Sequence, residues 1–192
     1  MPHYPRIVSL LSFLCIILTN FAHASDYNIQ ISMSGTQKIV AEAVYPVPLE
    51  AVWKVINAPQ EFPKFQPRIL SVAFLGLSKG SERYFVKIQT PGWLPNMWNI
   101  ISATSFKDTS KVTWKKMEGN LVEHEGFVQL KPDRESVKLH LEMTVQGLGL
   151  IPTRAVHWAV KSNVSRFLKL LGDELVSQKS LQPKVIEIPL KR

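Results

Sequence analysis

The sequence predicts an α+β domain in which a curved antiparallel sheet wraps around a long C-terminal helix, with two short helices after the first strand. Five or six segments of strand character lie close together between residues 69 and 145, and this short spacing favours an antiparallel meander. Residues 153–180 then carry a one-sided apolar stripe, which is typical of a helix that lies on a surface. A long antiparallel sheet curls, so a helix across its concave side leaves a cavity unless large side chains fill it.

The composition is that of one globular domain. The chain has 192 residues, of which 45% are hydrophobic and 20% charged, and this is too apolar for a disordered chain. Its one cysteine, Cys15, excludes a disulfide scaffold and a cysteine-based metal site. The formal net charge is +8, but the basic residues are dispersed, so nucleic acid is not an expected partner. An anionic membrane surface is compatible with this charge.

The first 24 residues are interpreted as a secretory signal peptide. Arg6 is the only charged residue before the apolar run at 8–18, and Ala22-His23-Ala24 supplies small residues for a cleavage site. The run is short for a membrane-spanning helix, which needs roughly 20 apolar residues, although an uncleaved anchor is the alternative. We therefore expect an exported protein, periplasmic or secreted, that is cleaved near Ala24. The folded domain would occupy residues 25–180, and 181–192 would form a basic C-terminal tail.

The first expected elements of the domain are one strand and two short helices. Residues 37–45 alternate as a strand does, and Pro46-Val47-Pro48 ends the strand. Residues 49–56 carry apolar side chains at the spacing of one helical face, and the preceding proline suits the first turn. A second helix at 59–65 must be short, because prolines interrupt it.

A run of strands and one long helix complete the domain. The clearest strand is the last one, in which apolar and polar residues alternate without a break. We expect strands at 69–75, 83–90, 97–106, 112–117, 121–130 and 137–145. The apolar stripe of the helix consists of Val156, Val160, Val164, Phe167, Leu168, Leu171 and Leu175.

Three short motifs occur in a fixed order along this domain. Residues 47–56 read VPLEAVWKVI, residues 62–67 read FPKFQP, and residues 126–132 read GFVQLKP. Together with the order of the elements, they resemble the START-like (SRPBCC) superfamily, in particular its polyketide cyclase and coenzyme Q-binding branch. Val128 stands where that branch usually has Trp. The resemblance covers about residues 39–178. It implies a helix-grip fold and a hydrophobic ligand, such as a lipid, isoprenoid or sterol-like molecule, but it does not identify the ligand.

A ligand would lie between the apolar face of the sheet and the long helix. Alternation places one set of side chains of the neighbouring strands on this face, and the resemblance aligns the strands with one another. A filled core without a cavity is the alternative, because aliphatic alternation alone does not separate the two. The predicted ligand-binding residues are Tyr84, Val86, Ile88, Trp98, Trp114, His124, Val128, Leu139, Leu141, Met143, Val156 and Val160.

Two connections are unusually apolar for loops. They lie at 91–98 and 147–152, and the resemblance places both near one end of the long helix. Apolar residues on loops often mark interaction sites, so we expect a membrane-touching or ligand-gating mouth, although loops that cap the core are the alternative. The residues concerned are Trp93, Leu94, Leu148, Leu150 and Ile151.

Catalytic signatures are weak in this sequence. His124 and Tyr84 are the only acid or base groups expected to face inward, and alternation sends Glu123 and Glu125 to the opposite face. We expect no catalytic residue, no metal and no cofactor, and a monomer that binds or transfers a hydrophobic molecule. The alternatives are a cyclase- or hydrolase-like enzyme of the same superfamily and an interaction module with a filled core.

Overall fold

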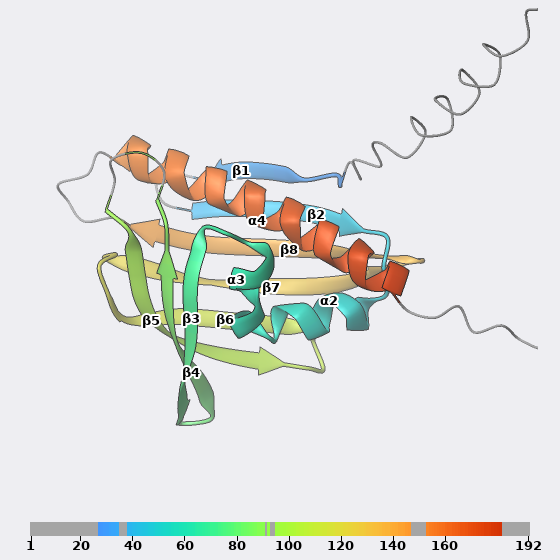
Figure 1. The fold of residues 1–192 in the computed structure, drawn as a ribbon, viewed down its shortest axis with the longest axis horizontal. Coiled ribbons are helices and arrows are strands. Elements are labelled where there is room, and N and C mark those ends of the chain that lie inside the picture. The colour runs from blue at the N-terminus through green and yellow to red at the C-terminus, as the bar shows by residue number, and fades with distance from the viewer. Residues whose placement is uncertain (1–26, 35–37, 91, 93–94, 147–152, 182–192) are drawn as a thin grey trace, which may run out of the picture.

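The computed structural model describes residues 27–34, 38–90, 92, 95–146 and 153–181. The predicted signal peptide and most of the C-terminal tail therefore lie outside the described residues. An eight-stranded antiparallel sheet curls around one long helix (Figure 1), as the sequence predicts. The elements are β1 (Gln30–Ser34), β2 (Lys38–Tyr45), α2 (Leu49–Ile56), the 3-10 turn η2 (Pro59–Glu61), α3 (Phe62–Phe65), β3 (Ile69–Ser78), β4 (Ser81–Ile88), β5 (Met97–Phe106), β6 (Lys111–Gly119), β7 (Glu123–Asp133), β8 (Ser136–Gln146) and α4 (Thr153–Leu181).

The strand order is β1-β2-β8-β7-β6-β5-β4-β3, so the chain runs as a meander from β3 to β8 and closes onto β2. The sequence analysis missed β1, which pairs with β2 at the edge of the sheet from Gln30↔Glu42 to Ser34↔Lys38. It also ended the first strand of the meander at Gly76, whereas β3 continues to Ser78. Gly76 has a φ of +105° and lies at a β-bulge. A residue with a side chain would adopt this φ only with strain.

The core lies between the concave face of the sheet and α4. Ile39, Ala41, Ala43 and Tyr45 of β2 are fully buried, and the predicted stripe of α4 is buried except for Phe167, which is half-buried. The Tyr45 hydroxyl donates a hydrogen bond of 2.8 Å to the carbonyl of Leu168 in α4. The two residues are 123 positions apart in the chain, and this bond connects the helix to the sheet.

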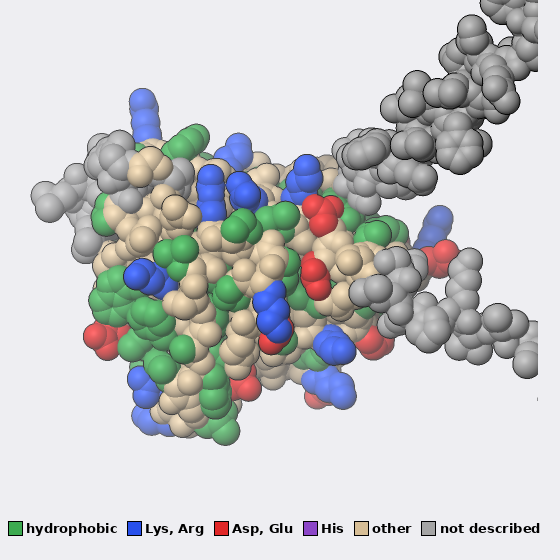
Figure 2. Space-filling view, in the orientation of Figure 1, with side chains coloured by type: hydrophobic (Ala, Val, Ile, Leu, Met, Phe, Trp, Pro, Cys, Tyr) green, Lys and Arg blue, Asp and Glu red, His purple; other side chains and the backbone are tan. Residues whose placement is uncertain are grey.

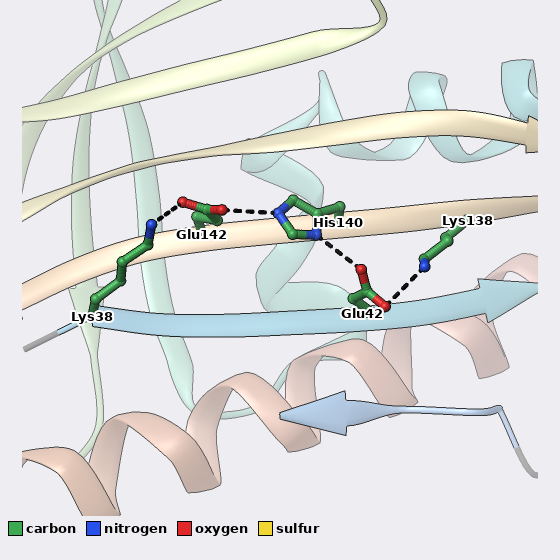
Figure 3. A network of polar contacts seen from close by, with 5 residues as sticks. All are labelled: Lys38, Glu42, Lys138, His140 and Glu142. Carbon is green, nitrogen blue, oxygen red and sulfur yellow. Dashed lines mark hydrogen bonds and ion pairs between the residues drawn. The ribbon is translucent and has the colours of Figure 1, made fainter. Parts of the chain in front are cut away.

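A chain of charged side chains links β2 and β8 on the outer face of the sheet (Figure 3). Lys38 pairs with Glu142 at 2.5 Å, and Lys138 pairs with Glu42 at 2.9 Å. His140 lies between the two carboxylates, with Nδ1 and Nε2 each 3.1 Å from one of them. Only the protonated ring has two N–H donors, so the imidazolium form makes both hydrogen bonds at once.

This network predicts a loss of stability in acid. Hydrogen bonds from Lys138 and then His140 lower the pKa of Glu42, and those from Lys38 and then His140 lower the pKa of Glu142. A depressed folded-state pKa contributes stability that is present above the ordinary glutamate value of 4.5 and disappears as pH falls through the folded-state value. The Glu42→Gln, Glu142→Gln double variant should lose about 0.2–1 kcal/mol per ion pair at pH 7. Urea unfolding at pH 3–7 should show a shallower acid dependence than wild type, and an unchanged slope would contradict the assignment.

Candidate functional site

A cavity of about 270 Å³ lies between the concave face of the sheet, α3 and α4. Its walls are almost entirely apolar, which is what a site for a hydrophobic molecule requires. The presence of a cavity contradicts the filled-core alternative. Ten of the twelve predicted ligand-binding residues line it: Tyr84, Val86, Ile88, Trp114, His124, Val128, Leu139, Leu141, Met143 and Val160.

Two of the predicted residues do not line the cavity. Trp98 lies on the opposite face of β5, where its ring stacks on Phe85 with the ring centroids 6.2 Å apart. Its neighbours Met97 and Asn99 face the cavity instead. Asn99 is a polar residue, yet only 2% of it is exposed. Val156 is a buried core residue of α4 and does not line the cavity.

The sequence analysis also missed a large part of the wall. The short helices contribute apolar side chains, and α3 closes the cavity against α4 through an aromatic cluster. In that cluster Phe62 and Phe167 lie edge to face at 5.1 Å, and Phe62 and Phe65 at 5.8 Å. Period-2 alternation along β3 and β5 could have identified part of the set. The lining residues missed as ligand-binding are Ile56, Pro59, Phe62, Gln66, Arg68, Ile69, Val72, Met97, Asn99, Ile101, Ala103, Val112, Leu121, Val145, Asn163, Val164, Phe167 and Leu168.

Four polar atoms in this apolar wall are buried and have no hydrogen-bond partner in the described part of the chain. They are Asn99 Oδ1, Trp114 Nε1, His124 Nδ1 and Asn163 Nδ2. A buried polar atom left unsatisfied costs about 1–3 kcal/mol. Polar groups of a bound molecule would remove this cost, so the four atoms are candidates for orienting a ligand.

Trp114 and His124 lie together at one side of the cavity, with ring centroids 6.2 Å apart. Gly126 makes room for the indole, because a Cβ atom there would lie 2.8 Å from Cζ2 of Trp114. The same Cβ would lie 2.2 Å from the carbonyl oxygen of Glu142, so this position cannot hold a side chain without a backbone shift. Burial lowers the pKa of His124 to about 4, so its ring is neutral at pH 7.

Tyr84 contributes an apolar ring rather than a free hydroxyl. Its hydroxyl donates a hydrogen bond of 2.6 Å to Oε2 of the exposed Glu82. Burial and then this hydrogen bond raise the pKa of Tyr84 well above its ordinary value. This side chain therefore offers the cavity neither a proton donor nor a proton acceptor near neutral pH.

The predicted gate residues Trp93, Leu94, Leu148, Leu150 and Ile151 lie outside the described residues. Within the described ranges, no group of three or more His, Cys, Asp or Glu side chains is arranged to hold a metal ion. The helices of those ranges include none that is both long and apolar enough to cross a membrane.

Comparison with known proteins identifies the fold. No protein-family model matches this sequence, and no curated protein matches it. Solved structures do match. The Zhui aromatase/cyclase from Streptomyces sp. R1128 has a TM-score of 0.66 at 12% identity, over 74% of this chain and 95% of that one.

Two further structures carry the superfamily name. A START superfamily protein from Mycobacterium smegmatis has a TM-score of 0.65 at 12% identity, over 74% of this chain and 99% of that one. A STAR-related lipid transfer protein from Xanthomonas axonopodis has a TM-score of 0.65 at 15% identity, over 78% of this chain and 98% of that one. The helix-grip fold of START-like proteins, which the three sequence motifs implied, is thereby confirmed.

Proposed function

We propose that this chain, which has the helix-grip fold of START-like proteins, is a monomeric binding or transfer protein for a lipid, isoprenoid or sterol-like molecule. The observation that carries the proposal is the apolar cavity of about 270 Å³ with four unpartnered polar atoms in its wall. Its volume is near the lower end of the roughly 300–1,000 Å³ that is usual for small-molecule sites. This size favours a compact or single-chain ligand. One structural neighbour is a lipid transfer protein by its title, which supports the same class of ligand.

Native mass spectrometry of protein purified from its host tests this function. We expect a non-covalent adduct that disappears on denaturation and that solvent extraction recovers as a hydrophobic compound. The neutral fluorescent probe N-phenyl-1-naphthylamine should also bind the ligand-free protein. A bare protein mass together with no binding of the probe would contradict the proposal.

The cyclase-like alternative depends on His124, the one imidazole in the described part of the cavity wall, and on the aromatase/cyclase among the structural neighbours. A pKa of about 4 makes this ring a weak base at pH 7, because general bases work best with a pKa near the operating pH. The described part of the wall also contains no carboxylate that could orient the ring. Binding without catalysis is therefore the better supported function.

Export is the second part of the proposal and rests on the N-terminal sequence alone. The mature protein would begin near Ser25 and would contain no cysteine, since Cys15 is removed with the signal peptide. N-terminal sequencing of the protein from a periplasmic or culture-medium fraction should give a start near Ser25. Recovery of the intact chain from the membrane fraction would favour the uncleaved anchor instead.

Contact with anionic membranes is supported by one exposed face of α4. Trp158 is 61% exposed, and the exposed Arg154 and Lys161 lie four residues before it and three after it, on the same side of the helix. Basic side chains follow α4 along the upper edge of the space-filling view (Figure 2). An exposed Trp between basic residues suits the headgroup region of an anionic bilayer.

The Trp158→Ala variant should therefore bind anionic vesicles at least about tenfold more weakly, because burying one large apolar side chain contributes roughly 1.5–3 kcal/mol. Co-sedimentation with phosphatidylglycerol vesicles measures this change. Met117→Ala is the matched control, since Met117 on β6 is equally exposed at 61% and does not lie on α4. Equal binding by the two variants would contradict the assignment of this face.

A further inference from the structure

One charged side chain lines the cavity in the described part of the chain. Arg68, which directly precedes β3, is a wall residue, whereas no Lys, Asp or Glu is found in that part of the wall. His124 is neutral near pH 7, because burial lowers its pKa. The wall therefore carries a single positive charge against an otherwise apolar surface.

The Arg68 guanidinium reaches across to α4, where it meets only neutral acceptors. Nη1 donates to Oδ1 of Asn163 at 2.9 Å and to Oγ of Ser162 at 3.3 Å. Within the described ranges, Arg68 forms no ion pair with a carboxylate. A half-buried cation without a counter-charge is unfavourable, and a bound anion would supply that charge.

Asn163 extends this group of donors. A guanidinium only donates hydrogen bonds, so the contact with Arg68 fixes Oδ1 of Asn163 on the side of Arg68. The amide nitrogen Nδ2 then points elsewhere, and it is buried without a partner in the described part of the chain. The hydrogen bond between Arg68 and Asn163 keeps their N–H groups close together in the wall, and Nδ2 has no acceptor in the described part of the chain.

We propose that this place is an anion site and that the ligand is a single-chain amphiphile whose carboxylate lies against Arg68 and Asn163. The inference rests on the proposed function, because the apolar body of the molecule would fill the cavity. A planar guanidinium matches the two oxygens of a carboxylate, and one positive charge matches a monoanion better than a phosphate dianion. Both residues are half-buried, so the charged end of the molecule would stay near solvent.

Two probes of equal chain length, decanoate and 1-decanol, separate the charge of the head from the apolar body. Each is titrated at pH 7.4 against protein loaded with N-phenyl-1-naphthylamine, and the displaced fluorescence gives its Kd. Wild type should bind decanoate at least about tenfold more tightly than 1-decanol. In Arg68→Gln, the affinity for decanoate should fall roughly 10- to 100-fold, and the affinity for 1-decanol should stay within about threefold.

Two further variants serve as controls for this interpretation. Arg166→Gln removes the same charge from an exposed position on α4 and should leave both affinities unchanged. Asn163→Asp is nearly isosteric and supplies Arg68 with an internal carboxylate, so it should abolish the preference for decanoate even if Arg68→Gln folds poorly. Decyl phosphate distinguishes the two kinds of anionic head, and tighter binding of it than of decanoate would overturn the carboxylate assignment.

The outcomes separate this inference from the function on which it rests. Equal affinities of wild type for decanoate and 1-decanol would overturn the anion site and leave the cavity as a hydrophobic site. An equal loss of affinity for both probes in Arg68→Gln would also overturn the anion site and leave the cavity as a hydrophobic site. Failure of wild type to bind either probe or the naphthylamine would overturn the proposed function as well.

Discussion

Leu141→Trp is expected to lower the affinity for N-phenyl-1-naphthylamine at least about tenfold, because the indole would occupy the cavity. Leu141 lies on β8, is 9% exposed and faces the cavity opposite α4. Overpacking of this kind costs about 1–3 kcal/mol of stability, so the sheet should remain folded. Fluorescence titration of the probe, with a urea unfolding curve on the same sample, measures both effects.

Thr144→Trp is the matched control for this change. It places the same ring on the same strand but on the outer face of the sheet, where Thr144 pairs with Lys38 and Glu125. Its affinity for the probe should equal that of wild type. If a folded Leu141→Trp protein bound the probe as wild type does, the cavity would not be the binding site.

Leu171→Ala should lower the free energy of unfolding by about 2–5 kcal/mol, the largest stability change that we expect from one substitution. Leu171 lies on α4, is fully buried and does not line the cavity, so the affinity for the probe should change little. The reason for the cost is that removal of the side chain leaves an unfilled space among tightly packed neighbours.

Urea unfolding measures the effect, and Val176→Ala provides the comparison. Val176 lies on the same helix but is 37% exposed, so its truncation should cost well under half as much. A cost below about 1 kcal/mol for Leu171→Ala would mean that α4 does not depend on close packing against the sheet.

Elements with strong local periodicity could be predicted from the sequence. The alternation of β8 and the apolar stripe of α4 repeat over many residues, so each specifies its own buried face. The strand β1 was missed because QISMS is short and lies at the edge of the sheet, where it is specified by its pairing with β2. Trp98 was predicted to bind the ligand, but its neighbour Asn99, a buried polar residue, faces the cavity instead.

The sequence by itself determined the class of the fold, the order of its main elements and part of the apolar wall, because each of these follows from patterns within a few neighbouring residues. Only the tertiary structure decided the polar part of the site. Arg68 and Asn163 are 95 residues apart, and no pattern in the sequence connects them. They meet because α4 crosses the concave face of the sheet beside the start of β3, and no local spacing in the chain encodes that crossing.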